Sequence, residues 1–111
     1  IGTEYETLAC EYLIRHGYQI LCRNFRCRQG EIDIIARDRD YLVFIEVKYR
    51  RDEHEGDPAE AVDARKQARI LHTARYYMTR YHISEDTPCR FDVVAVLGSN
   101  VRLIRDAFWC G

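Results

Sequence analysis

The sequence predicts a mixed α/β domain whose central sheet of about five strands is flanked by helices. Two segments carry apolar residues at helical spacing, and five short runs are rich in β-branched and aromatic residues. They follow the order α-β-β-β-α-β-β, with no internal repeat. We expect one domain over residues 1–111, because a chain of this length leaves little room for a second.

A first helix is predicted over residues 3–16. Apolar side chains recur there on one helical face, at Tyr5, Leu8, Ala9, Tyr12 and Leu13. Gly17 then supplies a stop signal. A strand is predicted over residues 18–28, and two longer β-rich runs on either side of the polar residues 37–40 predict a β-hairpin.

The second half begins with the charged residues 51–57, for which we predict a mobile loop. The residues Asp57-Pro58-Ala59-Glu60 predict a helix start, since Asp57 can cap the helix, proline suits its first position and Glu60 can complete a capping box. We expect this helix to run to about Tyr81. Two last strands are predicted over residues 90–97 and 101–106, joined by the turn Gly98-Ser99-Asn100.

The composition excludes several classes of protein. A hydrophobic fraction of 47% argues against a disordered chain, and no apolar run approaches the roughly 18 residues of a membrane span. No signal-peptide pattern opens the chain, so we expect a cytoplasmic protein with no membrane partner. The formal net charge of −1 argues against bulk positive charge as the means of holding nucleic acid.

The chain has five cysteines, Cys10, Cys22, Cys27, Cys89 and Cys110, at irregular spacings without a CxxC pair. Structural zinc sites contain closely spaced pairs, and disulfide-rich secreted domains rarely leave an odd cysteine over. We therefore expect reduced cysteines that serve as small apolar side chains in a cytosolic protein. A metal or redox role is the alternative.

Residues 30–48 carry the most informative pattern. Strand side chains alternate, so Glu46 and Lys48 share a face with Leu42 and Phe44 in an otherwise apolar strand. Ionised groups are rarely placed there without a partner or a task. On the preceding strand Glu31, Asp33 and Ile35 are expected to share a face, and the short hairpin turn favours a register that brings Asp33 near Glu46.

Two adjoining carboxylates repel each other unless a cation intervenes, and Mg²⁺ prefers oxygen ligands of this kind. Asp33 and Glu46 are therefore candidate metal ligands, and Lys48 could act on the attacking water of phosphodiester hydrolysis. An ion pair between Asp33 and Lys48 on a solvated sheet face is the structural alternative. Glu6 is a fourth candidate at the edge of the apolar stripe of the first helix, although periodicity alone favours a solvated position for it.

A longer pattern extends over nearly the whole chain. It comprises Gly2, Glu6, Ala9, Tyr12-Leu13, Gly17-Tyr18, Ile20-Leu21, Asn24, GEIDIIARD, LVFIEVKYR, GDPAEAV with Lys66, and the late RFDVVAV. In these residues the sequence resembles the YraN-type family of bacterial proteins. That family belongs with the PD-(D/E)xK, or restriction-endonuclease-like, nucleases and is similar to archaeal Holliday-junction resolvases.

The resemblance implies a restriction-endonuclease-like core with catalytic roles for Asp33, Glu46 and Lys48, which stand at the motif positions. It implies a catalytic role for Glu6 as well, which matches the first-helix glutamate of the resolvase-like branch. It also implies Mg²⁺ or Mn²⁺ as cofactor and a homodimer, because a junction has two strands to cut. Two departures from the pattern are Ile32, in place of the proline of the motif, and Tyr5, in place of a glycine before Glu6.

Basic residues gather in two tracts, residues 15–30 and 65–82, that contain no acidic residue, whereas residues 52–63 contain no lysine or arginine. Basic tracts beside a carboxylate cluster suit a nuclease, because arginines hold phosphates while carboxylates hold the ion. We take five of them as candidate nucleic-acid contacts: Arg26, Arg28, Arg65, Lys66 and Arg69. A solvated helix face is the alternative for the second tract.

These observations favour a metal-dependent endonuclease that hydrolyses DNA, including branched or structured forms. The alternative is a catalytically silent nucleic-acid-binding module that keeps the nuclease fold. A protein-interaction or redox role through the cysteines is a third hypothesis.

Overall fold

The computed structural model describes residues 2–51 and 62–108, in which two helices and five strands follow the predicted order. The strands form one sheet in the order β1 (Gln19–Cys27), β2 (Gly30–Asp38), β3 (Tyr41–Arg50), β4 (Cys89–Leu97) and β5 (Asn100–Ile104). β3 and β4 are parallel, and the other neighbours are antiparallel. The predicted mixed α/β class is confirmed.

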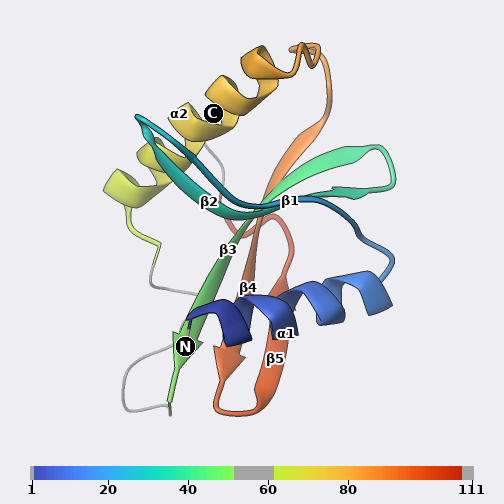
Figure 1. Ribbon diagram of the computed structural model, residues 1–111, viewed down its shortest axis with the longest axis vertical. Coiled ribbons are helices and arrows are strands. Elements are labelled where there is room, and N and C mark those ends of the chain that lie inside the picture. The colour runs from blue at the N-terminus through green and yellow to red at the C-terminus, as the bar shows by residue number, and fades with distance from the viewer. Residues whose placement is uncertain (1, 52–61, 109–111) are drawn as a thin grey trace.

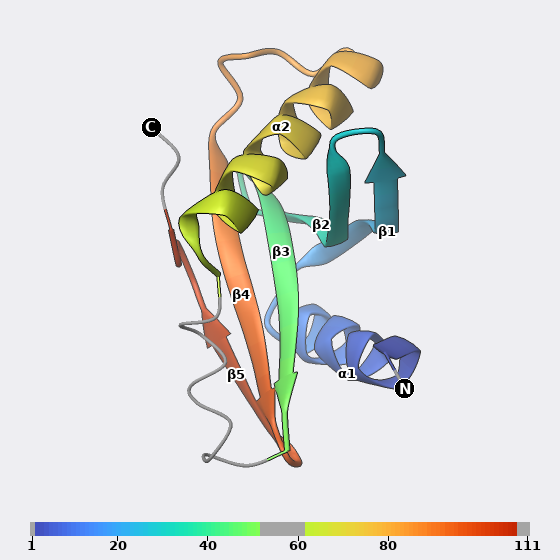
Figure 2. The ribbon, with the colours of Figure 1, turned by 90° about the vertical axis from the view of Figure 1, so that its left-hand side faces the viewer.

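The two helices lie on opposite faces of the sheet and toward opposite ends of it (Figures 1 and 2). α1 (Gly2–Arg15) packs on a buried cluster that includes Ile34, Val43 and Val94. α2 (Ala64–Arg80) packs on a second cluster, which includes Ile35 and Phe44. Successive residues of β3 therefore pack alternately in the two clusters, because successive side chains of a strand point to opposite faces of the sheet.

The end of α1 explains the stop signal in the sequence. Tyr18 N–H donates to the Leu13 carbonyl at 3.0 Å, and Gly17 N–H donates to the Ile14 carbonyl at 3.1 Å. These are the two bonds of a Schellman motif, and Gly17 takes the left-handed conformation that the motif needs, with φ +89°.

The buried face of α1 is rotated from the predicted one. Ala9, Cys10 and Leu13 are buried, while Leu8 is 41% exposed. Glu6 is partly buried and lies three and four residues before Ala9 and Cys10, so it belongs to the sheet-facing side. The solvated position that periodicity favoured for Glu6 is therefore wrong. The predicted apolar stripe included Leu8, which is exposed, and so it was centred away from Glu6.

α2 begins later than predicted. Asp63 is its N-cap, and the Asp63 side chain accepts a hydrogen bond from Lys66 N–H at 2.9 Å. Val62 is buried and non-helical, so one continuous helix from Asp57 to Tyr81 is wrong. Asp63 is as good a cap as Asp57, and the burial of Val62 in the α2-side cluster favours the second start. Residues 52–57 of the predicted loop and residues 57–60 of the predicted helix start lie outside the described residues.

The cysteines of the described chain, Cys10, Cys22, Cys27 and Cys89, form no disulfide, and Cys110 lies outside it. Cys10 is a buried member of the α1-side cluster, which is the apolar use predicted for these residues. Within residues 2–51 and 62–108, neither helix is long and apolar enough to span a membrane.

A buried polar network joins β4 to the end of α1. The Asp92 carboxylate is fully buried and accepts hydrogen bonds from Tyr18 Oη at 2.8 Å, from Arg90 Nε and Nη2 at 2.9 Å each, and from Asp106 N–H at 2.9 Å. Arg90 Nη2 also donates to Asp38 Oδ2 at 2.8 Å. Burial and the contact with Asp92 raise the pKa of Tyr18 to about 12. Every charge in this network is therefore paired.

Asp92→Ala should lower the free energy of unfolding by about 3–5 kcal/mol, because removing one partner of a buried ion pair leaves the other uncompensated. Urea denaturation measures the loss. Asp86→Ala removes an exposed carboxylate and should change stability by less than about 0.5 kcal/mol. Equal stability of the Asp92→Ala protein and the unmodified protein would contradict a bracing role for the network.

Candidate functional site

The site forms where β2 separates from β3. The two strands pair from Asp38 and Tyr41 only as far as Ile34 and Ile45, whereas β3 continues beside β4 to Arg50. The hairpin of β1 and β2 bends away toward α2 (Figure 1). Among the described residues, one edge of β3 thereby has no strand partner after Ile45. A register shift in β1 and the left-handed backbone of Asn24, with φ +55°, accompany the bend.

Asp33 lies at the point of separation. Its Oδ2 accepts a hydrogen bond from Val47 N–H at 2.8 Å, and so it satisfies a strand donor that β2 no longer pairs. The alternation of β2 breaks at this point, because Ile32 and Ile35 both pack in the α2-side cluster although they are three residues apart. The predicted shared face of Glu31, Asp33 and Ile35 is therefore wrong, since Glu31 is exposed while Ile35 is buried.

The expected proximity of Asp33 and Glu46 is confirmed, because the Glu46 carboxylate acts on the Asp33 carboxyl group. Burial and the Glu46 carboxylate raise the pKa of Asp33 to about 7, with a further contribution from Glu6, against the opposing hydrogen bond from Val47. Ionisation of Asp33 is therefore disfavoured beside the Glu46 carboxylate, as expected for two carboxyl groups in one partly buried site.

Two lysines contact the same oxygen of Glu46, whose side chain is 9% exposed. Lys66 Nζ lies 2.9 Å from Glu46 Oε1, and Lys48 Nζ lies 3.8 Å from it. Burial and the neighbouring Lys66 lower the pKa of Lys48. Burial opposes protonation of Lys66 too, but its contact with Glu46 outweighs burial and raises its pKa.

These contacts replace the alternative arrangement considered from the sequence. Among the ion pairs of the described residues, Lys48 pairs with Glu46 rather than with Asp33. Lys66, which lies closer to Glu46 than Lys48 does, comes from α2. The sequence had indicated a nucleic-acid contact for this residue instead. The available signal in the sequence is Asp63, three residues earlier, which can cap a helix that begins at Ala64 and so places Lys66 in its first turn.

Glu6 approaches the pair from α1. Its Oε1 atom is buried and has no hydrogen-bond partner among the described residues, and its charge raises the pKa of Asp33. The neighbouring Tyr5 stacks on Tyr49 of β3 with ring centroids 3.7 Å apart. The tyrosine that replaces the expected glycine thus packs the start of α1 against the end of β3.

Carboxylate oxygens of this kind fit a hard divalent cation. Within the described ranges no three His, Cys, Asp or Glu side chains already form a ligand set. Asp33 and Glu46 would supply two ligands, and the unpartnered Glu6 oxygen is a further candidate. Mg²⁺ usually binds through one or two carboxylates and retains several waters, so two protein ligands are enough.

The basic candidates other than Lys66 lie on two adjacent elements. Arg65 and Arg69 are exposed on α2, and Arg28 is exposed in the β1–β2 turn. A Cβ atom added to Gly30 would lie 3.1 Å from Thr73 Oγ1 and 3.8 Å from Arg69 Cβ, so this turn packs directly on α2. Arg26 pairs with Glu31 at 2.9 Å, both side chains being exposed.

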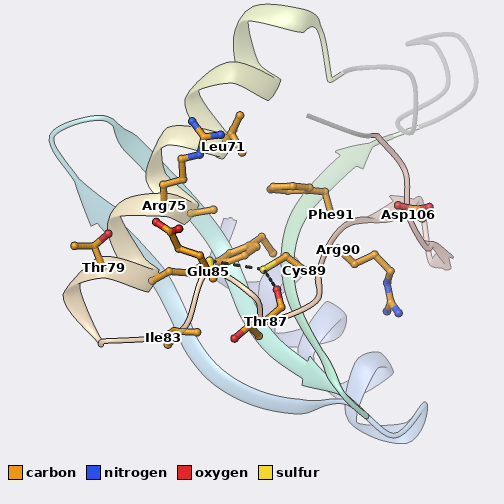
Figure 3. A pocket seen from close by; sticks show the side chains of 13 residues that line it. Leu71, Arg75, Thr79, Ile83, Glu85, Thr87, Cys89, Arg90, Phe91 and Asp106 are labelled. Atoms are coloured by element: carbon orange, nitrogen blue, oxygen red, sulfur yellow. Dashed lines mark hydrogen bonds between the residues drawn. The ribbon is translucent and has the colours of Figure 1, made fainter. Parts of the chain in front are cut away.

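A cavity of about 640 Å³ lies between the C-terminal half of α2 and the start of β4 (Figure 3). Its lining includes Phe44, Leu71, Met78, Cys89 and Phe91, with Arg75 and Glu85. Cys89 Sγ donates to the Thr87 carbonyl at 3.4 Å within it. None of the predicted site residues lines this cavity, so the carboxylate pair is a separate feature.

A model of the uncharacterised protein family UPF0102 matches residues 5–96. The chain belongs to family UPF0102. It is 55% identical over 107 residues to the UPF0102 protein of Lachnoclostridium phytofermentans, an alignment that covers 96% of this chain and 91% of that protein. It is 44% identical over 111 residues to the UPF0102 protein of Nitrosococcus oceani, covering 96% and 90%. It is 47% identical over 115 residues to the UPF0102 protein of Caldicellulosiruptor bescii, an alignment that covers 97% of this chain and 96% of that protein. Membership of the YraN-type family is thereby confirmed.

Stability of the metal-free protein should fall as pH rises through the range set by Asp33. The folded state holds a proton on Asp33 up to about pH 7, whereas an unfolded aspartate loses it near pH 3.9. Because the folded state binds more protons in this window, the free energy of unfolding decreases between about pH 4 and pH 7. Asp33→Asn should remove this contribution.

The measurement is urea denaturation at several pH values with a metal chelator present. Asp40→Asn, which removes an exposed carboxylate from the β2–β3 turn, is the matched control and should follow the unmodified protein. Identical pH profiles for Asp33→Asn and Asp40→Asn would show that Asp33 does not titrate in this range.

Proposed function

We propose that this protein is a metal-dependent endonuclease that hydrolyses phosphodiester bonds in DNA. The observation that carries the proposal is the adjacent carboxyl groups of Asp33 and Glu46 beside the edge of β3 that β2 leaves. Such a pair is destabilised by its own repulsion, and a divalent cation relieves that repulsion. Lys48 follows Glu46 by two residues and its Nζ lies 3.8 Å from Glu46 Oε1, which places it beside the proposed metal ligand, where it would act on the attacking water of phosphodiester hydrolysis.

The proposal includes membership of the restriction-endonuclease-like superfamily. An aspartate on one strand and a Glu-x-Lys sequence on the next form the PD-(D/E)xK pattern, here without its proline. Glu6 on the first helix supports a likeness to Holliday-junction resolvases, which in turn supports branched DNA as substrate and a homodimer as the active form.

Each residue has a chemical role in this proposal. Oxygens of Asp33 and Glu46 would hold Mg²⁺ or Mn²⁺, and Glu6 would support them. When bound, such a cation polarises the phosphate and activates water. Lys48 Nζ, with its pKa lowered by burial and by Lys66, would exchange a proton with the attacking water.

The exposed arginines would hold the nucleic acid. Arg65 and Arg69 on α2 and Arg28 in the adjacent turn are free to contact successive phosphates. Arg26 should contribute less, because Glu31 already neutralises it.

A catalytically silent binding module is the second candidate, and one contact favours it. Lys66 already neutralises Glu46 at 2.9 Å, so a cation is present at the carboxylate without any metal. The two candidates differ in whether the protein cuts the DNA that it binds.

Glu46→Gln and Asp33→Asn should each lower DNA cleavage by more than about 100-fold, the upper end of the effect seen for outer-shell partners of metal ligands. The assay uses linear, flapped and four-way DNA with Mg²⁺ or Mn²⁺. Glu85→Gln, prepared in the same way, is the control for a contaminating nuclease and should cut like the unmodified protein. Binding without cleavage of any substrate would favour the silent module, and full activity of the Asp33→Asn, Glu46→Gln double variant would exclude this site.

A further inference from the structure

Lys66 is held at Glu46 by the start of α2. Its backbone N–H donates to the Asp63 cap, and its side chain extends to Glu46 Oε1 at 2.9 Å. The cap fixes the first turn of the helix and therefore determines which residue of that turn faces β3. Because the cap uses only the backbone of Lys66, the side chain can change its partner without disturbing the helix.

The two lysines on Glu46 differ in their access to solvent. The Lys48 side chain is 16% exposed and the Lys66 side chain is 32% exposed, although Lys66 makes the shorter contact. Arg69 follows Lys66 by three residues and Arg65 by four, so exposed Arg69 is a helical neighbour of both Lys66 and the exposed Arg65 on α2. A phosphate group held by these arginines would therefore come within reach of the Lys66 ammonium.

We propose that Lys66 is a displaceable counter-ion that links metal binding to nucleic-acid binding at the Asp33–Glu46 pair. Without metal, its ammonium neutralises Glu46. A divalent cation at the pair takes the place of that ammonium, because two cations on one carboxylate oxygen repel each other. A phosphate on α2 draws the ammonium outward and leaves Glu46 open to the metal. The inference rests on the proposed function for the presence of the metal.

The two binding events then strengthen each other. If nucleic acid raises the affinity for metal by some factor, metal must raise the affinity for nucleic acid by the same factor. Lys66 accounts for part of that factor. Its contact with Glu46 is broken by whichever ligand binds first, so the second ligand binds without that cost. The protein would in this way hold metal weakly until a substrate backbone is present.

The first test is calorimetric titration of the full chain with Mn²⁺ in the absence of DNA. Lys66→Gln should bind Mn²⁺ on the order of tenfold more tightly than the unmodified protein, which corresponds to about 1.4 kcal/mol for the lost competitor. Arg75→Gln is the matched control, because it removes one exposed positive charge from the same helix but not from Glu46. The Mn²⁺ affinity of Arg75→Gln should stay within about twofold of that of the unmodified protein. Arg75 lies nine residues after Lys66 in α2, and salt screens its exposed charge.

The second test repeats the titration with Ca²⁺ in the presence and absence of a four-way DNA, because Ca²⁺ takes the same oxygen ligands. DNA should bring the Ca²⁺ affinities of the Lys66→Gln and unmodified proteins together, because Lys66 has then left Glu46 in both cases. A difference that persists unchanged on DNA would overturn the linkage.

The outcomes separate the two proposals. If Mn²⁺ binds the unmodified protein and Lys66→Gln with the same affinity, or if Arg75→Gln tightens binding as much, Lys66 is not a displaced counter-ion, while the proposed function stands. If neither protein binds Mn²⁺ and both still bind DNA, the metal site of the proposed function is wrong, and the role of Lys66 is excluded with it.

Discussion

The hydrogen bond from Val47 N–H to the Asp33 carboxylate is the contact around which the candidate site is organised. It occurs where β2 leaves β3, and it supplies the acceptor that the departing strand no longer provides. By holding Asp33 at the free edge of β3, it brings this carboxylate against Glu46, on which two lysines converge. The separation of the strands depends in turn on distant packing, because the β1–β2 hairpin lies against α2 with Gly30 close to Thr73. The hydrogen bond between Val47 and Asp33 therefore depends on how the β1–β2 hairpin packs against α2.

Two buried acidic centres occur in the part of the chain that the structure describes, and they differ in the charges around them. Asp92 is fully buried, but all of its partners are donors, so its charge is stabilised. Asp33 and Glu46 face each other, so burial and repulsion act in the same direction and raise the pKa of Asp33. A buried charge in an apolar strand is thus no sign of chemistry by itself. Two like charges held close together, whose repulsion a ligand would relieve, are a stronger indication of a functional site.

Glu46 and Asp92 have similar sequence contexts but different surroundings in the structure. An acidic residue in an apolar strand singled out Glu46, and the same rule applies to Asp92, which lies in the run RFDVVAV. The partners that separate the two cases come from remote segments, since Tyr18 is 74 residues from Asp92. Lys66 shows the same limit: helical periodicity placed it beside Arg65 and Arg69, but only the position of α2 over β3 turns its side chain to Glu46 rather than to solvent.

Local periodicity and turn chemistry were enough to predict the order of the elements, the mixed α/β class and the hairpin that brings Asp33 toward Glu46. The tertiary structure decided the rotation of α1 that turns Glu6 inward, the choice of Asp63 over Asp57 as the cap of α2, and the break in alternation around Asp33. Each of these depends on which of several locally acceptable arrangements buries more apolar surface against a distant part of the chain. Periodicity counts neighbours along one element, and so it cannot weigh such contacts.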